Sequence, residues 1–403
     1  MVRGLMRLAG LLCATIVTSV NAAGLSDDAV RIGVLTDMSG PYADLGGRGS
    51  VKAAEMAVAD FGGTVTGKPV QLLVADHQNK PDVASSIVRE WIDQRGLDMV
   101  VDALGSPVGL AVAKIVADRK RIMINTGAVT ARLTNEDCTA YTIHYVFDSV
   151  MFSNGTARAL LERGMRSWYF LAADNAFGAS LEADVTKVVR EGGGSVVGHT
   201  LHPVNTPDFS SFLVQAQSSG AQIVALANAG QDTINSIKTA AEFGMLDGKQ
   251  KFAGLFVLIN DIHALAPAVA QGLVVTDPWY WDLNDATRAF ARRFYGDVKT
   301  MPNSAQAGIY SAVTNYLKAI EKAGTDDADS VMKTLKSTEI NDLFATHGYI
   351  REDGRMIHDV SLMEVKKPSE VKYPWDYLKF LATVKGEDAF LPLAKSVCPL
   401  VKK

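Results

Sequence analysis

The side chains that usually carry out catalysis are scattered along this 403-residue chain. Its seven histidines are spread from His77 to His358, and only His199 and His202 have a spacing that metal ligands use. These two fall on a predicted strand, where residues three apart face opposite sides of the sheet. No serine stands in a Gly-x-Ser-x-Gly turn, and no base can be argued for Cys138. We therefore expect no catalytic residues, no enzyme activity and no metal site.

Glycine-rich segments raise the question of nucleotide binding. Residues 62–68, GGTVTGK, have the spacing of a phosphate-binding loop, but Pro69 stands where that loop needs a serine or threonine for magnesium. The segment also follows a predicted helix and precedes a predicted strand, the reverse of the order that cradles a phosphate. Gly46, Gly47 and Gly49 do not have the spacing of a dinucleotide fingerprint. We therefore expect no cofactor.

The N-terminal segment has the layout of a secretory signal. Arg3 and Arg7 precede an apolar run over residues 8–20, and Ala22 and Ala23 follow it. The alternative is a membrane anchor, but the run is shorter than the roughly 20 apolar residues that span a bilayer. We expect residues 1–23 to be a signal peptide that is cleaved near Ala22 or Ala23, and a mature chain that works in the periplasm.

Composition narrows the class of protein further. The 40 basic and 44 acidic residues give a formal net charge of -4, which predicts no basic face for nucleic acid. No later segment is a charge-free apolar run of membrane length. A chain of this length with 48% hydrophobic residues usually forms more than one core. We expect two lobes, no nucleic-acid partner and no membrane insertion.

Two cysteines remain after the signal segment, Cys138 and Cys398. In an oxidising compartment two such cysteines favour a disulfide, and both lie in stretches that read as surface loops. A bridge would hold a C-terminal tail that could otherwise fray. The alternative is two buried free thiols.

Short β-branched runs alternate with helical patterns along most of the chain, which predicts parallel sheets covered by helices. A first series has strands at 30–37, 70–76, 99–104 and 122–126, with helices at 47–60, 81–96 and 107–120. A second series has strands at 168–173, 195–201, 223–227 and 251–255, with helices at 177–191, 209–218 and 232–243. Then follow a strand at 273–276, helices at 285–295, 304–323 and 328–335, and a hairpin of 348–351 with 356–365 around the turn 352–355. The fold class is therefore α/β with two lobes of similar plan.

Ligands in open α/β sheets bind beyond the carboxyl ends of the strands. In the first series these loops hold Tyr42, Ser106 and residues 127–130. Ser106 precedes a predicted helix, so it either contacts a ligand anion or serves as an ordinary N-cap. In the second series Phe177 either covers an apolar ligand or forms a hydrophobic staple at a helix start.

Further candidates follow the later strands. Asn228 begins and Asp232 ends the segment that follows the strand at 223–227. Tyr280 lies between two tryptophans after the strand at 273–276. Three adjacent aromatic residues are unusual in a purely structural loop, although at least one should belong to the core.

The order of several segments resembles the periplasmic substrate-binding proteins of branched-chain amino acid type ABC transporters. These segments are VRIGVLTDMSGPYADLG, LGSPVGLAVAKI, RIMINTGAVTARLT, AADNAFGASLEADV, VALANAGQDTINSIKTAAEFGM and GLVVTDPWYWDL. The resemblance covers nearly all of the mature chain. It implies two Rossmann-like lobes joined by a hinge of three crossings, with residues 24–147 and 277–345 in one lobe and residues 148–276 and 346–403 in the other. It also implies a ligand trapped between the lobes and delivered to a membrane permease.

The resemblance assigns roles to particular positions. Ser106 matches the serine that holds the ligand carboxylate, and Gly127, Ala128 and Thr130 match a second carboxylate-binding loop. Phe177 stands where a tyrosine often stacks over the ligand.

One position departs from the pattern of the family. Amino-acid binders have an acidic residue for the ammonium group where this chain has Phe256, at the end of the segment FAGLF. A buried ammonium without a carboxylate costs several kcal/mol. We therefore expect the ligand to be an apolar or aromatic carboxylate. The alternative is that Asp232 or Asp277 pairs with the ammonium group in place of the missing acidic residue. The ligand would then be a branched-chain amino acid, another amino acid or an amide.

The expected function is capture of a small solute by lobe closure, as a monomer that works with the permease subunits of an ABC transporter. A ligand sensor that presents its bound state to a partner protein is the competing class. An output domain would favour that reading, and the sequence encodes none.

Overall fold

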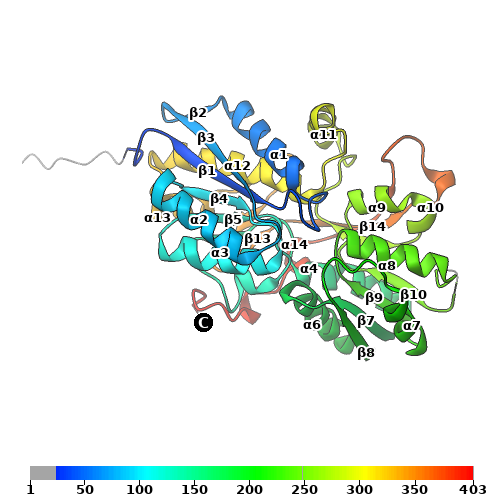
Figure 1. Cartoon of the computed structure of the whole chain (residues 1–403). Coiled ribbons are helices and arrows are strands. Elements are labelled where there is room, and N and C mark those ends of the chain that lie inside the picture. The colour runs from blue at the N-terminus through cyan, green and yellow to red at the C-terminus, as the bar shows by residue number, and fades with distance from the viewer. Residues whose placement is uncertain (1–23, 247, 403) are drawn as a thin grey trace, which may run out of the picture.

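The computed structural model describes residues 24–246 and 248–402, and the predicted signal peptide lies outside them. Within these residues no helix combines the length and apolar character needed to cross a bilayer. The chain forms two α/β lobes side by side (Figure 1). The predicted fold class is confirmed.

The first lobe is built on a six-stranded sheet with the order β2-β3-β1-β4-β5-β6. Its strands are β1 (Val30–Thr36), β2 (Thr64–Val65), β3 (Lys68–Asp76), β4 (Met99–Asp102), β5 (Ile122–Asn125) and β6 (Thr142–His144). Every pair is parallel except β2 with β3. The helices are α1 (Gly47–Phe61), α2 (Pro81–Arg95), α3 (Ser106–Asp118), α11 (Asp285–Val298), α12 (Ser304–Ala323) and α13 (Ala328–Lys336), and a 3-10 turn, η1, spans Ala131–Thr134. Helices α1 and α12 pack together on one face, and α2 and α3 pack together on the other (Figure 1).

The second lobe has a four-stranded parallel sheet with the order β10-β9-β7-β8. Its strands are β7 (Ser167–Ala173), β8 (Ser195–His202), β9 (Ile223–Ala227) and β10 (Lys251–Gly254). Its helices are α4 (Ser149–Phe152), the π-helical turn η2 (Ser153–Ala157), α5 (Arg158–Glu162), α6 (Ala176–Glu191), α7 (Ser210–Ser218), α8 (Gln231–Glu242), α9 (Ile259–Leu265) and α10 (Pro267–Ala270). The two series of strands and helices expected from the sequence are both present. The helical stretch from α4 to α5 and the strand β6 were not expected.

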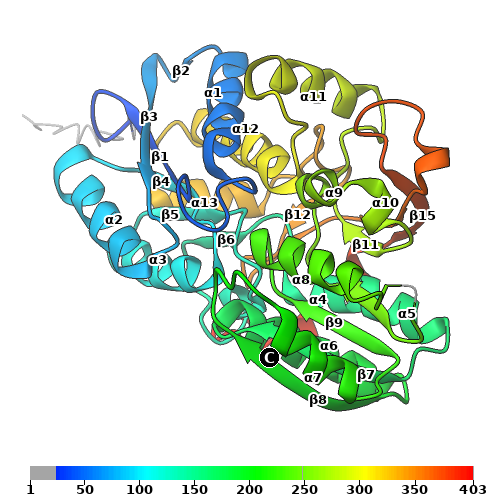
Figure 2. The ribbon, with the colours of Figure 1, turned by 45° about the vertical axis from the view of Figure 1, so that its right-hand side comes forward.

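A third, three-stranded sheet completes the second lobe (Figure 2). It has the order β11-β14-β15, with β11 (Val274–Asp277), β14 (Val360–Val365) and β15 (Leu378–Val384), and short turns η3 (Pro368–Glu370), α14 (Gly386–Ala389) and η4 (Leu393–Lys395) lie near or after β15. The predicted hairpin is present, but its second arm is shorter than the expected residues 356–365. Strand β13 (Met356–Ile357) pairs with β12 (Tyr349–Ile350), but the chain then turns away and β14 pairs with β11 and β15.

The chain passes between the lobes after β6, after β11 and between β13 and β14. The β12-β13 hairpin still lies against the first sheet, because Arg355 is bridged to His144 of β6. The third passage therefore falls near residues 358–359. The lobe boundaries that the resemblance implies, with residues 346–403 in the second lobe, stay a prediction. Cys138 and Cys398 form a disulfide, as the sequence predicted.

Candidate functional site

A narrow cavity lies between the lobes, beyond the carboxyl ends of β4, β5 and β10. Its walls are mainly apolar and aromatic, and they come from both lobes. The lining residues are Tyr42, Leu45, Leu104, Gly105, Ser106, Pro107, Gly127, Val129, Phe177, Ala229 and Phe256. The cavity has a volume of about 20 Å³. A solute of even modest size enters only if the walls move apart.

Helix α3 places the hydroxyl group of Ser106 at this cavity. The residue in the N-cap position is Gly105, with φ +94°, so the expectation that Ser106 is an ordinary N-cap was wrong. The Ser106 Oγ instead accepts hydrogen bonds from the backbone N–H groups of Val129 and Thr130, at 3.2 and 3.1 Å. The hydroxyl proton is still free to be donated, and the first turn of α3 has N–H groups without intrahelical partners. Together these donors suit a carboxylate.

Asn125 joins the two loops that carry these donors. Its Nδ2 donates to the carbonyl oxygens of Asp102 and Ala103, at 2.8 and 3.1 Å, and its Oδ1 accepts from the N–H of Ala128 at 2.9 Å. Asp102 and Ala103 have φ values of +77° and +47°, a region that non-glycine residues rarely adopt. Asn125 therefore holds a strained turn directly before Ser106. The sequence reasoning missed this residue, although an asparagine at the end of a buried strand is a usable signal.

Aromatic rings form the opposite wall. Phe256 meets Phe177 edge to face, with ring centroids 5.8 Å apart, and it meets Phe147 and Phe152 in the same manner at 5.2 and 5.4 Å. Such contacts favour aromatic partners beyond the area they bury. Tyr42 completes the wall from the first lobe, and burial raises the pKa of its hydroxyl well above the ordinary value. This hydroxyl is therefore neutral and able to form hydrogen bonds.

The Tyr42 loop is positioned by a carboxylate that the sequence reasoning did not single out. Asp37 accepts hydrogen bonds from the N–H groups of Gly40, at 2.7 Å, and Tyr42, at 3.0 Å. Burial raises the pKa of Asp37 despite these bonds. The loop is thus tied to the end of β1 and presents Tyr42 to the cavity.

Among the residues that the structure describes, no charged side chain lines the cavity. The carboxylate of Asp232 accepts hydrogen bonds from the N–H groups of Asn205 and Thr206, at 3.1 and 2.9 Å, within the second lobe. The carboxylate of Asp277 lies beside the N–H of Trp279 at 3.3 Å, and burial raises its pKa to about 7. Neither carboxylate reaches the cavity.

The structure brings together five of the ten residues expected at the site and leaves the others outside the lining. Tyr42, Ser106, Gly127, Phe177 and Phe256 line the cavity, whereas Ala128, Thr130, Asn228, Asp232 and Tyr280 do not. Asn228 donates to Ser236 and accepts from Thr233 inside the second lobe. The Tyr280 hydroxyl donates to the carbonyl oxygen of Trp375 at 2.9 Å.

Thr130 instead connects the two lobes. Its Oγ1 lies 2.7 Å from the Oγ of Ser180 on α6, and both hydroxyls are able to donate. A second contact joins Gly230 to the Tyr42 loop, since a Cβ at this glycine would lie 2.9 Å from the carbonyl oxygen of Pro41. The Nδ2 of Asn303 donates to the Oδ1 of Asn260 across the same boundary at 2.9 Å. The lobes are therefore closed upon each other.

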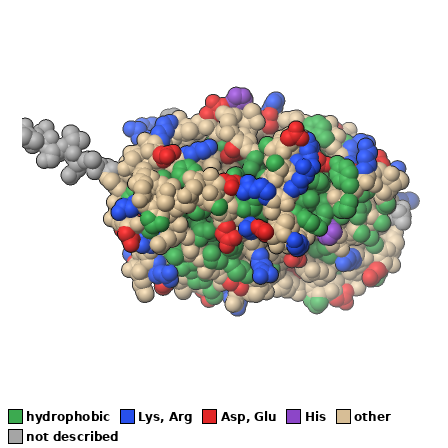
Figure 3. Space-filling model, turned by 90° about the horizontal axis from the view of Figure 1, so that it is seen from above, with side chains coloured by type: hydrophobic (Ala, Val, Ile, Leu, Met, Phe, Trp, Pro, Cys, Tyr) green, Lys and Arg blue, Asp and Glu red, His purple; other side chains and the backbone are tan. Residues whose placement is uncertain are grey.

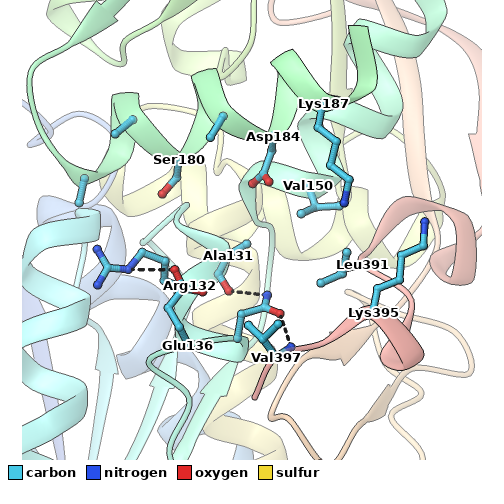
Figure 4. A pocket seen from close by; sticks show the side chains of 14 residues that line it. Ala131, Arg132, Glu136, Val150, Ser180, Asp184, Lys187, Leu391, Lys395 and Val397 are labelled. Carbon is cyan, nitrogen blue, oxygen red and sulfur yellow. Dashed lines mark hydrogen bonds and ion pairs between the residues drawn. The ribbon is translucent and has the colours of Figure 1, made fainter. Parts of the chain in front are cut away.

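A larger cavity lies beside this one, between η1, α6 and the C-terminal residues (Figure 4). Its volume is about 410 Å³. Arg132, Glu136, Asp184, Lys187 and Lys395 line it with charges of both signs. It opens along η1, α6 and the C-terminal residues, and its Arg132 is already paired with Asp137. The smaller cavity is therefore the better candidate for a solute site.

In the described part of the chain, no group of three or more histidine, cysteine, aspartate or glutamate residues is arranged to hold a metal ion. Charged side chains of both signs are interspersed on the face in Figure 3.

Comparison with known proteins gives a consistent result. A family model described as periplasmic binding protein matches residues 29–370. A periplasmic binding protein of solved structure from Burkholderia mallei is 51% identical, with a TM-score of 0.91 over 93% of this chain and 100% of that chain. A branched chain amino acid ABC transporter periplasmic ligand-binding protein from Burkholderia xenovorans is 39% identical, with a TM-score of 0.83 over the same shares.

More distant proteins also match this chain. A Leu/Ile/Val-binding protein homolog from Brucella melitensis is 23% identical over 407 residues, covering 96% of each chain. An ABC transporter solute binding protein from Rhodopseudomonas palustris, solved in complex with 4-hydroxybenzoate, is 21% identical, with a TM-score of 0.80 over 89% of this chain and 98% of that chain.

Proposed function

The chain belongs to the periplasmic binding protein family, and on that premise we propose that it captures a small apolar or aromatic carboxylate between its lobes and delivers it to the permease of an ABC importer. Such a protein works outside the cytoplasm. The same proposal includes two further points. The signal peptide is cleaved near Ala22 or Ala23, and the mature protein is a monomer.

One observation carries the choice of ligand: the cavity offers hydrogen-bond donors at one end and only apolar or aromatic surface elsewhere. Ser106 and the start of α3 can receive a carboxylate. An α-amino acid also needs a partner for its ammonium group, and burying that charge unpaired costs several kcal/mol. With Phe256 in the aromatic wall and no carboxylate in the lining, an acid without an ammonium group fits best.

Aromatic acids are favoured among such solutes. The rings of Phe177 and Phe256 meet edge to face at an interplanar angle of 76°, where a flat ring can be held by edge-to-face contacts. The R. palustris protein that was solved with 4-hydroxybenzoate has a similar fold, and this similarity of fold is the support that it gives to an aromatic acid.

Capture requires the lobes to part and close again. The cavity is nearly filled in the closed form, and its walls come from both lobes. The bound state is then selected because only the closed arrangement surrounds the solute. Delivery would follow when a permease favours the open form.

Calorimetric titration tests the proposal with benzoate, 4-hydroxybenzoate, benzamide and leucine. Benzoate or its hydroxylated form should bind, and benzamide should bind much more weakly because it lacks the negative charge. Tight leucine binding with no response to either aromatic acid would instead support a branched-chain amino acid as the ligand, as the name of the B. xenovorans protein suggests.

A further inference from the structure

The loop that follows strand β3 lies beside the solute cavity. In the first sheet β3 pairs in parallel with β1, and the ends of the two strands meet as Thr36 opposite Asp76. Residues 77–80 therefore leave the sheet at the same edge as the loop that carries Tyr42. We refer to residues 77–80 as the β3 loop.

Two side chains hold the β3 loop in an unusual backbone conformation. Gln78 and Asn79 have φ values of +54° and +53°, a region that residues other than glycine rarely adopt. Asp76 accepts a hydrogen bond from the N–H of Gln78 at 2.8 Å, and Nδ1 of His77 accepts one from the N–H of Asn79 at 3.0 Å. Burial lowers the pKa of His77 to about 4, so this ring is neutral and able to accept. Strained residues of this kind cluster at ligand sites.

The β3 loop brings the side-chain oxygen of Asn79 against Gly105. A Cβ built on Gly105 would lie 2.8 Å from the Oδ1 of Asn79 and 3.9 Å from the Cε2 of the Tyr42 ring. Gly105 and Tyr42 both line the cavity, and Asn79 stands directly behind them. Because position 105 is a glycine, no side chain at this position covers the oxygen.

This oxygen has no hydrogen-bond donor. The side chain of Asn79 is partly exposed, but its Oδ1 is buried and accepts no hydrogen bond within the described residues. A buried acceptor that stays unpaired costs free energy, and most such groups in folded proteins have a partner. Asn79 therefore offers an unused acceptor at the edge of the cavity.

The missing donor has to lie close to the solute carboxylate. Ser106, which offers the carboxylate its hydroxyl, follows Gly105 directly, and neighbouring Cα atoms are about 3.8 Å apart. A hydroxyl group on the carbon next to the carboxylate is near enough to reach Asn79. A hydroxyl group in the para position of a benzoate points to the opposite end of the cavity.

We propose that Asn79 selects an α-hydroxy acid, by accepting a hydrogen bond from the hydroxyl group on the carbon next to the solute carboxylate. The inference rests on the proposed function, because it needs a carboxylate at Ser106. An ammonium group in place of the hydroxyl would meet a neutral oxygen, which does not compensate a buried charge.

Calorimetric titration with paired acids tests the role of Asn79. Phenylacetate and mandelate differ only by a hydroxyl group on the carbon next to the carboxylate, and isovalerate and α-hydroxyisovalerate give the same comparison without a ring. Asn79→Gly removes the amide and tolerates the left-handed backbone. Gln78→Gly is the matched control, since Gln78 has nearly the same φ and its side chain is exposed. Thermal unfolding of both variants checks that the fold is kept.

In the parent protein the hydroxy acid of at least one pair should bind roughly two- to tenfold more tightly than its partner, as one hydrogen bond allows. Asn79→Gly should remove this preference without weakening the unhydroxylated acid, whereas Gln78→Gly should keep it. Equal Kd values within both pairs, or a preference that survives in Asn79→Gly, would overturn the inference. An equal loss for both members of a pair would also overturn it, because Asn79 would then bind the carboxylate itself.

Failure of the proposed function looks different in the same experiment. None of these acids would then bind the parent protein, or phenylglycine, which has an ammonium group in place of the hydroxyl of mandelate, would bind more tightly than mandelate. Either result would overturn the ligand class and the role of Asn79 together.

Discussion

The side chain of Asn125 donates a hydrogen bond to the backbone carbonyl oxygen of Asp102 at 2.8 Å, and this contact connects the ends of two neighbouring strands. The same side chain also contacts Ala103 and Ala128. Three hydrogen bonds from one buried amide thus shape both loops that carry the donors of the cavity.

Replacing Asn125 with alanine should lower the free energy of unfolding and weaken solute binding. The change removes the side-chain donor from the buried carbonyl oxygens of Asp102 and Ala103, and only the Asp102 oxygen keeps a long bond from the N–H of Thr126, so the loss costs about 1 to 3 kcal/mol. Urea unfolding and calorimetric titration measure the two effects. A loss of less than about 0.5 kcal/mol in both, typical of ordinary surface substitutions, would show that the strained turn does not depend on this amide.

Ser106→Ala should weaken the binding of a carboxylate by about 1 to 3 kcal/mol, since a buried hydrogen bond to a charged group is lost. The hydroxyl also accepts from Val129 and Thr130, so stability should fall as well. Titration well below the unfolding temperature separates the two effects. Ser218→Ala, on an exposed face of α7, is the matched control. Equal affinities in the two variants would remove Ser106 from the site.

Phe256→Leu should reduce the preference for aromatic over aliphatic acids. Leucine keeps most of the apolar volume but loses the edge-to-face contacts, which are worth about 0.5 to 1.5 kcal/mol each. The test compares the ratio of Kd values for benzoate and a branched aliphatic acid in the variant and the parent. Phe243→Leu, at an exposed position, should leave the ratio unchanged. The same ratio in all three proteins would argue against an aromatic solute.

Ser180→Ala should weaken every solute to a similar degree. The lost partner of Thr130 lies outside the cavity, so the change acts on lobe closure and not on recognition. A hydrogen bond of this kind contributes about 0.5 to 1.5 kcal/mol, which corresponds to roughly a two- to tenfold higher Kd. A variant that weakens aromatic acids but leaves other ligands unaffected would contradict this role.

Asp277 should make stability depend on pH. Burial raises its folded pKa to about 7, above the value of about 3.9 in an unfolded chain, so between these values the folded state binds more protons. The contribution of Asp277 to stability is therefore largest below pH 4 and is lost as the pH rises towards 7. Asp277→Asn should become more stable relative to the parent as the pH increases from 5 to 8. Urea unfolding at several pH values checks this, with exposed Asp82→Asn as the control. A difference that does not change with pH would contradict it.

The pattern of strands and helices was predictable because each buried strand is a short apolar run between helical patterns. Strand ends also located the loops of the cavity, including those that hold Ser106 and Phe256. The directions of side chains were not predictable in the same way. Asn228 and Tyr280 follow strands as ligand residues do, yet their polar groups form hydrogen bonds within the protein.

Contacts between the lobes also could not be predicted from the sequence. Thr130 and Ser180 are 50 residues apart in the chain, and only the closed arrangement brings them together. The left-handed backbone that Asn125 holds could not be predicted, because Asp102 and Ala103 are not glycines, so the strand-end asparagine itself was the available signal.

The disulfide between Cys138 and Cys398 also closes part of the chain into a covalent ring. Its two cysteines are 260 residues apart, so the covalent ring contains the whole second series of strands together with the passages between the lobes. In a chain-entropy account, closing so long a ring disfavours the denatured state by about 5 kcal/mol. If the second lobe unfolds first, the two chain segments that form it stay joined to the folded remainder. Refolding of that lobe is then a search within a closed loop, and a single proteolytic cut inside it releases no fragment.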